Sequence, residues 1–456
     1  MNTNSQINWQ QAQAARSSGN WSLLIQYLQQ LILGDRQPPA IAESEDLSEI
    51  NAGQNPTRSH LLDMALEVLV AGDFHQRWDI AKLLPKLGQK TYAGDVEAVI
   101  APLIEILEDE EADEELRWFA GRTLGDFDRP TAIAALVELL KTSNSEELSA
   151  MAAAALGQIG SPAVAALTKL LAEENTRLLA VQALSHIRRS ETIAPLLGVV
   201  QDPQVTIRAA VIEALSSFHD PRIPPILVSA LDDLAAQVRR EAVIGLSFRS
   251  DLREELDLVN RLRQRLYDFN LDVCAAAAIA LGRLGTDTAA AALFQVLQSP
   301  NTPSSLQIEI IRALGRVGTA TSLAYLHSGL NHLESVTIWQ EIVTVLGRVE
   351  QPDLMTQAAQ ILIDVLKSNH PATQHESVKQ AIALSLGQLG EMQAVDPLID
   401  LLADADAGVR LHAIAALKHL APEAAHRQLE QMATNEALAP SLKQGVAIAL
   451  QEWSID

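Results

Sequence analysis

The chain has 456 residues, 48% of them apolar but only 4% aromatic, and its 57 acidic against 34 basic side chains give a formal charge of −23. This much negative charge repels phosphate groups and excludes nucleic acid as a general partner. A single cysteine, Cys274, excludes an internal disulfide and a multi-cysteine zinc site. No signal peptide is recognisable, and no apolar run approaches the ~20 residues that span a bilayer. We therefore expect a cytoplasmic protein without a transmembrane segment.

The first 58 residues differ from the rest of the chain. Residues 1–33 are expected to form N-terminal capping helices, with Trp9 and Trp21 on apolar faces. A stack of repeats leaves its first hydrophobic side open, so it needs such a cap. Residues 34–58 are polar and rich in Pro, Ser and Glu, which is typical of a flexible linker or loop. The remaining residues, 59–456, are expected to form one array of repeats.

From residue 77 onward the chain repeats an eight-residue pattern, which we call the frame. Apolar and small residues stand at helical steps, a leucine stands at the eighth position, and the first position is usually basic. The frames begin at Arg77, Arg117, Ser149, Arg177, Arg208, Arg239, Cys274, Gln307, Trp339, Lys379, Arg410 and Lys443. The intervals between them are 28 to 40 residues. Each frame predicts an amphipathic helix.

A second helix is expected between successive frames. Residues 130–142 and 394–404 have the apolar spacing of such a helix, and a glycine often follows the leucine of the frame. Turn signals such as Gln201-Asp202-Pro203 separate the units. Helix pairs of about 30 residues stacked in series make an α-solenoid. The fold class is therefore all-α, an α-α superhelix of about twelve helix-pair repeats.

Two stretches carry a family resemblance, LVSALDDLAAQVRREAVIGLSF and LIDLLADADAGVRLHAIAALKHL. They resemble HEAT-like repeats of the pattern LxDxxxxVRxxAxxALGxxG, so the superhelix is expected to be of the HEAT/armadillo type. The variety of about 31 residues, rich in alanine and Leu-Gly pairs, is similar to the repeats of the phycobilisome (bilin) lyase family. The resemblance covers roughly residues 60–456. It implies that frame arginines tie one repeat to an acidic residue of its neighbour.

The segment 115–127, ELRWFAGRTLGDF, resembles an aromatic helix of the E/F-type bilin lyases. Arg117 and Trp118 stand in comparable places, and Arg77-Trp78 repeats the pair one frame earlier. The resemblance implies that both tryptophans face a tetrapyrrole or a groove-binding peptide, with Arg122 near a propionate. In this chain Arg122-Thr123 replaces the second aromatic pair of the lyases. The alternative is that both tryptophans only pack between helices.

Charge is unevenly distributed. Residues 177–265 carry 12 arginines, no lysine and 11 acids, whereas both flanking regions are strongly acidic. Arginine suits bidentate contacts with carboxylates, so Arg208, Arg239 and Arg240 are candidates for binding an acidic protein patch or propionate groups. The alternative is an ordinary solvated helix surface. The frame arginines themselves are interpreted as mainly structural.

Catalytic and metal-binding patterns are not recognisable. Seven acids lie between Glu108 and Glu115 without the spacing or glycine of an EF-hand, so a solvated loop is expected there. Deoxyhypusine hydroxylases hold two irons on a HEAT-like array with four His-Glu pairs, but only His375-Glu376 occurs here. No phosphate-binding loop, nucleophile elbow or zinc spacing is found. We expect no catalytic residue and no metal.

These observations predict a protein-binding scaffold, adaptor or assembly chaperone that binds a protein on its concave surface. The family resemblance suggests a cyanobacterial setting, with a phycobiliprotein or a subunit of a photosynthetic complex as the partner. The alternative is an E/F-type phycobilin lyase or bilin-binding protein, with bilin as its cofactor; otherwise no cofactor is expected. Whether the protein is an enzyme stays open, with a non-enzymatic role preferred.

Overall fold

The computed structural model describes residues 3–33, 57–89, 94–368 and 370–453. All regular secondary structure in these residues is helical, which confirms the predicted all-α solenoid. The chain divides into two compact units, residues 1–219 and 220–456. The predicted linker lies almost entirely outside the described residues, and helix α3 begins within its expected range, at Arg58.

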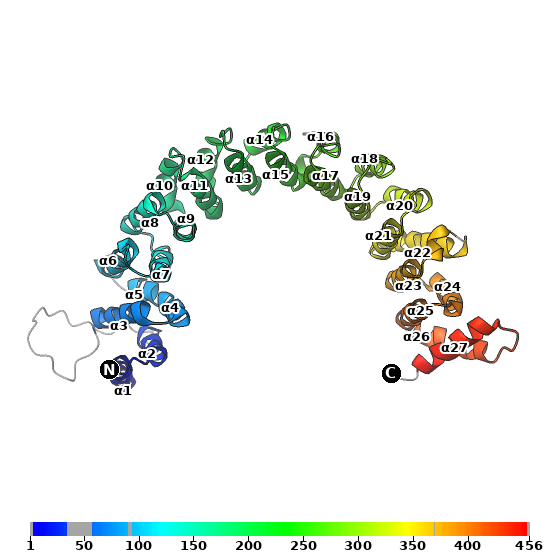
Figure 1. Cartoon of the computed structure of the whole chain (residues 1–456), viewed down its shortest axis with the longest axis horizontal. Coiled ribbons are helices and arrows are strands. Elements are labelled where there is room, and N and C mark those ends of the chain that lie inside the picture. Colours follow the sequence, from blue (N-terminus) through cyan, green and yellow to red (C-terminus); the bar gives the residue numbers. More distant parts are fainter. Residues whose placement is uncertain (1–2, 34–56, 90–93, 369, 454–456) are drawn as a thin grey trace, which may run out of the picture. The chain divides into compact units, whose positions relative to one another are not determined.

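Each of the twelve predicted frames begins in an α-helix, which we call a frame helix, and each frame helix follows a partner helix (Figure 1). The frame helices of the first unit are α4 (Phe74–Ala81), α7 (Glu114–Leu124), α9 (Glu146–Ile159), α11 (Arg177–Ile187) and α13 (Val205–Ser216). Their partner helices are α3 (Arg58–Ala71), α6 (Gly94–Glu108), α8 (Pro130–Thr142), α10 (Val164–Leu170) and α12 (Ile193–Leu197).

The second unit repeats this arrangement. Its frame helices are α15 (Ala236–Ser247), α17 (Leu271–Leu284), α19 (Ser304–Val317), α21 (Val336–Gly347), α23 (Glu376–Leu389), α25 (Ala407–Leu420) and α27 (Pro440–Trp453). Their partner helices are α14 (Ile223–Ala230), α16 (Leu258–Arg265), α18 (Asp287–Leu297), α20 (Ala320–His332), α22 (Pro352–Lys367), α24 (Val395–Asp400) and α26 (Pro422–Ala433).

Three further α-helices precede or interrupt the array. Helix α1 (Thr3–Ser17) packs on α2 (Trp21–Leu33), which contacts α3 and α4. That these two helices act as a cap stays a prediction. Helix α5 (Leu84–Gln89) continues the first frame after a break, because Pro85 has no N–H with which to extend α4. Short 3-10 helices are η1 (Ser161–Ala163), η2 (Ser190–Thr192), η3 (Ser250–Leu252), η4 (Pro371–Gln374), η5 (Met392–Ala394) and η6 (Leu401–Ala403).

Within each unit, frame helices stack on frame helices in one layer and partner helices form the other layer (Figure 1). The glycine after the frame leucine lies where two frame helices touch. A Cβ atom at Gly282 would stand 3.0 Å from the Cα of Ala313, and one at Gly387 would stand 3.0 Å from the Cα of Ala416. Similar crowding is found at Gly125, Gly157, Gly315 and Gly347. These glycines therefore set how closely the frame helices approach.

The second glycine of the Leu-Gly-x-x-Gly pattern has a different role. Gly285, Gly318 and Gly390 have φ angles of 64°, 64° and 73° and directly follow α17, α19 and α23. A left-handed residue closes the end of a helix, and glycine adopts this conformation at little cost. One five-residue pattern thus encodes both a close helix contact and a helix end.

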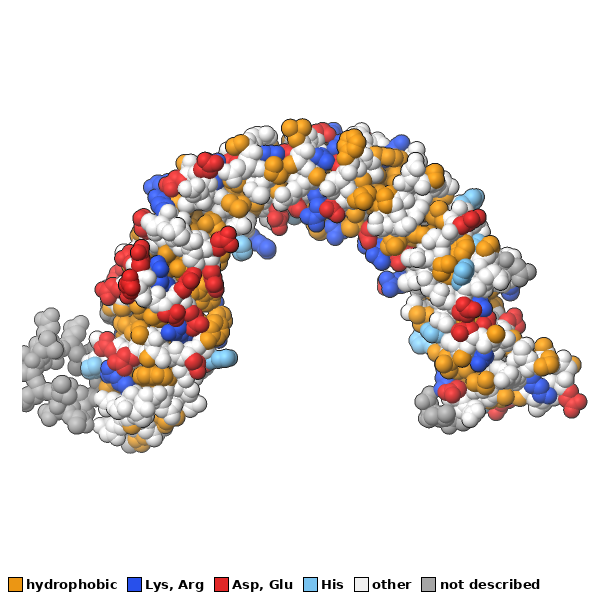
Figure 2. Space-filling model, viewed as in Figure 1, with side chains coloured by type: hydrophobic (Ala, Val, Ile, Leu, Met, Phe, Trp, Pro, Cys, Tyr) orange, Lys and Arg blue, Asp and Glu red, His pale blue; other side chains and the backbone are white. Residues whose placement is uncertain are grey.

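The acidic residues of the first unit gather over α6 and α7 (Figure 2), where residues 108–115 join the two helices. Asp113 in this segment accepts a hydrogen bond from Arg77, which lowers the pKa of its carboxyl group. Among the described residues, no single helix is long and apolar enough to cross a membrane. The bent pair Glu146–Ile159 and Ser161–Leu170 meets that criterion only when the two helices are taken together.

Candidate protein-binding site

The frame arginines bond to carbonyl groups in the last turn of the preceding partner helix or in the turn that follows it. Arg239 Nη1 donates to the backbone oxygens of Asp233 and Leu234, at 2.8 and 3.0 Å. Arg410 Nη1 donates to those of Asp404 and Ala405, at 2.8 Å each. Carbonyls at a helix end or in the turn after it have no partner within the helix, so a guanidinium group satisfies them. Corresponding bonds are made by Arg77, Arg117, Arg177 and Arg208.

Two frames without a basic first residue use other donors at the same position. The indole Nε1 of Trp339 donates to the backbone oxygen of Leu330, at 3.1 Å. The Cys274 Sγ donates to the backbone oxygen of Asp268, at 3.2 Å, and burial raises the pKa of this thiol. The first frame position therefore serves to hold the end of the preceding partner helix or the turn that follows it. This explains Cys274 without any reactive role.

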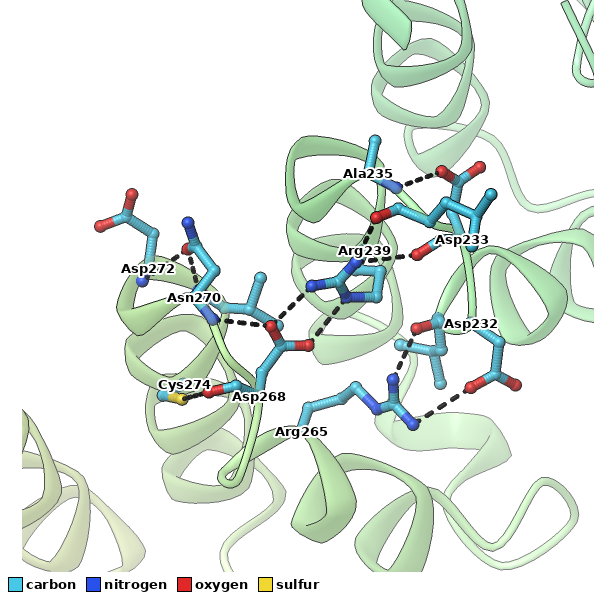
Figure 3. A network of polar contacts seen from close by, with 12 residues as sticks. Asp232, Asp233, Ala235, Arg239, Arg265, Asp268, Asn270, Asp272 and Cys274 are labelled. Carbon is cyan, nitrogen blue, oxygen red and sulfur yellow. Dashed lines mark hydrogen bonds and ion pairs between the residues drawn. The ribbon is translucent and has the colours of Figure 1, made fainter. Parts of the chain in front are cut away.

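Some first-position cations also reach the following repeat. Arg239 Nε and Nη2 donate to the two carboxylate oxygens of Asp268, at 2.8 and 2.6 Å (Figure 3). The two side chains are only 12% and 5% exposed. The hydrogen bonds from Arg239 lower the pKa of the Asp268 carboxyl group, so it is held ionised. We call such a pair a rung; the others are Arg77–Asp113, Arg177–Asp202 and Lys379–Asp404.

The arginine-rich region 177–265 is largely engaged within the chain. Arg240 pairs with Glu241, and Arg265 donates to the backbone oxygen of Leu231 and to Asp232. Nine of the 12 arginines donate hydrogen bonds to groups of their own chain. Most of this positive charge therefore stabilises turns and helix ends. Binding of a partner by Arg208, Arg239 or Arg240 stays a prediction.

The predicted Trp78 belongs to a group of side chains from α4 and α7 that we call the aromatic cluster: Phe74, Trp78, Lys82, Phe119 and Arg122. The rings of Phe74 and Trp78 are stacked, with centroids 6.3 Å apart. Phe119 meets both rings edge-on, at 5.3 and 6.3 Å, and is fully buried. Phe74 is 50% exposed. A buried ring thus supports two rings that reach the surface.

Two cations lie against the Trp78 ring. The Lys82 Nζ is 5.2 Å and the Arg122 Cζ is 5.0 Å from the ring centroid. These distances are within the range of cation–π attraction, worth about 0.5–1 kcal/mol at exposed sites. Arg122 comes from α7 and Trp78 from α4, so the contact joins two repeats. The cluster offers apolar area and positive charge at one place.

Trp118 lies beside the aromatic cluster. It meets Phe119 edge-on at 5.2 Å, and its position four residues before Arg122 places both on one face of α7. Asp126 follows α7, accepts a hydrogen bond from Gln158, and has its carboxyl pKa raised by burial. Arg117 is turned to the carbonyl of Leu107, at 3.0 Å. The structure therefore brings Arg122 onto the Trp78 ring, leaves Trp118 in ring contact with its neighbour Phe119, and places Arg117 at a helix end.

The sequence did not identify Phe74, Lys82 or Phe119 as members of this group. A signal was present on α4, because Phe74, Trp78 and Lys82 are spaced by four residues and so share one helix face. Phe119 is adjacent to Trp118, but its burial depends on the packing of α4 against α7. That contact is made between two separate helices, so the spacing of residues in the sequence does not predict it.

Metal-binding groups and surface hollows were compared with the position of the two tryptophans. Within the ranges the structure describes, no group of three or more His, Cys, Asp or Glu side chains is arranged to hold a metal ion. One shallow hollow of about 390 Å³ lies between α2 and α4, lined by Ser22, Gln26 and Asp79 among others. Another of about 430 Å³ lies between α8 and α10, beside Val137 and Ala166. Trp78 and Trp118 line neither hollow.

An array of helix pairs held by carbonyl-capping arginines and rungs, with an aromatic group on its frame helices, defines a repeat solenoid. The pattern of HEAT repeats matches residues 100–177, 164–247, 224–304, 257–337 and 359–451. The chain therefore belongs to the HEAT-repeat proteins. Membership of the bilin lyase branch of such repeats stays a prediction.

The chain is similar to the protein YibA of Escherichia coli, both of strain K12 and of O157:H7, with 33% identity over 117 residues. This match covers 25% of the chain and 39% of YibA. A structure describing the binding of Kap95p to RanGDP is similar over 95% of this chain and 58% of the matched chain in that structure, with 14% identity and a TM-score of 0.50. A structure of importin beta is similar over 87% of this chain and 64% of the importin chain, with 14% identity and a TM-score of 0.49. At such identities the structural likeness concerns the fold alone.

Proposed function

We propose that the protein is a non-enzymatic HEAT-repeat scaffold or assembly chaperone and that the aromatic cluster is part of its protein-binding surface. The observation that carries this proposal is the Trp78 ring, stacked on half-exposed Phe74 and covered by Lys82 and Arg122. Tryptophan and arginine are enriched among the residues that dominate binding energy at protein interfaces. A partner that covers this group gains apolar contact and pairs its own acids with the two cations.

The buried support below the cluster favours binding. Phe119 is fully buried and touches both Phe74 and Trp78, so the two outer rings are held in place before a partner arrives. Little side-chain entropy is then lost on association. Arg122 from the neighbouring repeat lies over the Trp78 ring and helps to hold it. A rigid aromatic anchor with a cationic edge fits a folded protein with an acidic, partly apolar surface.

We further propose that the client is a phycobiliprotein or another subunit of a light-harvesting complex. The support is the resemblance of the alanine- and Leu-Gly-rich repeats, and of the segment 115–127, to the bilin lyase repeats. Purified phycocyanin is the probe, measured by biolayer interferometry against the immobilised full-length chain. We expect Trp78→Ala to weaken binding by at least about tenfold, because hot-spot truncations cost about 2 kcal/mol or more.

The matched control is Tyr325→Ala. Tyr325 stacks on Phe294 at 4.4 Å, but this pair joins the partner helices α18 and α20 instead of frame helices. We expect this variant to bind phycocyanin like the wild type. Equal losses in both variants would assign the effect to stability instead of the cluster. Failure of the wild type to bind phycocyanin would reject this client.

Binding of a bilin is the second candidate function. It is favoured by the two cations close to the Trp78 ring, since a tetrapyrrole carries two propionate groups that could pair with Lys82 and Arg122. Titration of the full chain with free phycocyanobilin, followed by visible absorption, tests it. A red-shifted complex that is lost in Trp78→Ala and Trp118→Ala supports this function, whereas an unchanged bilin spectrum rejects it.

A further inference from the structure

Three arginines stand at the same place in three successive frame helices, and we call them the arginine row. Arg283 and Arg316 lie in the last turn of α17 and α19, and Arg348 directly follows α21, each two residues after the frame leucine. All three residues are exposed, and blue side chains project from the frame-helix side of the second unit (Figure 2). Successive frame helices contact one another, so the row runs across three repeats.

The fold does not require arginine at this position. The corresponding residues of α9 and α23, which have the same Leu-Gly-x-x-Gly pattern, are Gln158 and Gln388. Arg283 donates to the Ser247 hydroxyl, at 2.8 Å, and none of the row arginines binds an acid among the residues that the structure describes. A cation near a helix end gains only a small attraction to the helix dipole. The three guanidinium groups are therefore available to carboxylates of a partner.

The charges around the row are mixed. Asp287 and Asp353 lie in the first turn of the partner helices α18 and α22, and Glu350 lies in the turn after α21. The segment 249–257, between α15 and α16, carries two arginines and four acids. A dense polyanion such as nucleic acid would meet these acids as well as the arginines. A ligand with one carboxylate for each arginine can pair with the row and avoid the acids.

A second set of charges lies nearer the middle of the same helices. Arg312 of α19 binds Glu309 and Glu341, at 2.8 Å each. Each of these acids stands seven residues before a row arginine, about 10 Å along its helix. At physiological salt this separation screens most of the interaction between exposed charges. The acids in the middle of α19 and α21 therefore do not neutralise the row.

The spacing of the row indicates the conformation of its ligand. Packed helices lie about 8–10 Å apart, so the row presents one guanidinium group at about this interval. A polyproline II helix has about three residues per turn and rises about 3.1 Å per residue, so one of its faces repeats about every 9 Å. In a β-strand, by contrast, residues three apart point to opposite faces. A segment in the polyproline II conformation can thus place one carboxylate against each arginine, in the bidentate contact that a guanidinium group favours.

An exposed aromatic ring continues the row toward α15. Phe248 stands two residues after its frame leucine, as the row arginines do, and is 61% exposed. The Arg283 Cζ lies 4.5 Å from the centroid of this ring. Proline-rich segments in the polyproline II conformation dock on aromatic rings. Phe248 therefore offers a contact for a proline beside the carboxylate that binds Arg283.

We propose that the arginine row and Phe248 form a docking site for an extended acidic protein segment, with Asp or Glu at every third residue and proline between them. The site lies in the second unit, whereas the aromatic cluster lies in the first. It therefore does not depend on the proposed function of the cluster, and its failure would leave that proposal unchanged.

The probe is the fluorescein-labelled peptide Glu-Pro-Ala-Glu-Pro-Ala-Glu-Pro-Ala, measured by fluorescence anisotropy against the full-length chain. The test variant is Arg283→Gln, Arg316→Gln, Arg348→Gln, which introduces the side chain that other repeats have at this position. An exposed ion pair changes affinity by about two- to fivefold, so loss of all three should weaken binding at least about tenfold. Binding to the wild type should also weaken in high salt. Circular dichroism and thermal unfolding verify that the variant folds.

Two controls match charge and composition. The variant Lys367→Gln, Arg427→Gln, Lys443→Gln removes three exposed cations of the same unit, from α22, α26 and α27, and should bind the peptide like the wild type. A peptide of the same composition with its three glutamates next to one another should bind the wild type more weakly, because it cannot reach all three arginines. Trp78→Ala, in the aromatic cluster, should leave binding of the periodic peptide unchanged.

Several results would overturn this proposal. They are failure of the periodic peptide to bind the wild type, equal losses of affinity in the two triple variants, and equal binding of the periodic and rearranged peptides. A single-stranded oligonucleotide that binds the wild type more tightly than the peptide does, and is released in the row variant, would overturn it as well by assigning the row to nucleic acid.

Discussion

The Arg239 rung in the second unit and the Arg122 contact in the first show two uses of arginine on the same kind of helix. Arg239 stands at the first frame position, where two carbonyls and two carboxylate oxygens occupy its donors. Arg122 stands at the sixth position of its frame and lies over the Trp78 ring. Arg239 thus faces the turns between helices, whereas Arg122 faces the neighbouring frame helix. The position of an arginine within the frame therefore indicates its role better than the mere fact that the residue is an arginine.

The largest effect is expected from Asp268→Ala. This change removes the one carboxylate group that Arg239 binds through both oxygens. The Arg239 side chain is only 12% exposed, so the loss should lower the stability of the second unit by about 3 kcal/mol. Urea unfolding combined with hydrogen exchange of the α15 and α17 amides measures it, because long arrays can unfold in parts. Glu254→Ala is the control: its pair with Arg253 is largely exposed, so little change is expected. Equal losses in the two variants would contradict the structural role of the rung.

A somewhat smaller loss of stability is expected from Gly282→Ala. This change tests the close packing of frame helices, which is found in both units. The new Cβ would stand 3.0 Å from the Cα and backbone oxygen of Ala313, so α17 and α19 must separate, at a cost of about 2 kcal/mol. Gly408→Ala is the matched control, because its Cβ would meet the flexible end of the Gln380 side chain. Thermal unfolding compares the two. A neutral Gly282→Ala would mean that the frame helices tolerate a wider spacing.

The rung also predicts a dependence on pH. Because the folded-state pKa of Asp268 is lowered by Arg239, its contribution to stability is full above the unfolded pKa of about 3.9 and is lost as pH falls through the folded value. Asp268→Asn should cost about 1.5 kcal/mol at neutral pH. The difference from the wild type in urea midpoint should be constant from neutrality to about pH 4 and shrink below it. If the difference in urea midpoint between the wild type and Asp268→Asn grew as the pH fell, the predicted contribution of ionised Asp268 to stability would be wrong.

The smallest effect on stability is expected from Arg122→Gln. Removing the cation from the Trp78 face should cost less than about 1 kcal/mol, since this contact is near the surface. The same change should weaken binding of an acidic client and make binding less sensitive to salt. A stability loss as large as that of Asp268→Ala would show that Arg122 has the structural role of a first-position arginine after all.

Much of the fold could be predicted because its signals are local. Residues 130–142 were expected to form a helix and do so as α8, since proline begins it and apolar residues follow at helical steps. The frame arginines were interpreted as structural, and they bond to carbonyls at helix ends or in the following turns. The candidate site was predictable only in part: Trp78, Trp118 and Arg122 were identified, whereas Phe74, Lys82 and Phe119 were not.

The sequence alone determined the repeat, the helices and the contacts between frame helices, because a periodic pattern acts within each unit and recurs at a regular interval. Only the tertiary structure decided which acid meets which arginine, which rings join Trp78, and that one guanidinium holds the turns of Leu234 and Phe269. These arrangements depend on how far each helix is shifted and rotated against the next. That offset comes from the packing of many side chains at once, so no single repeat contains it.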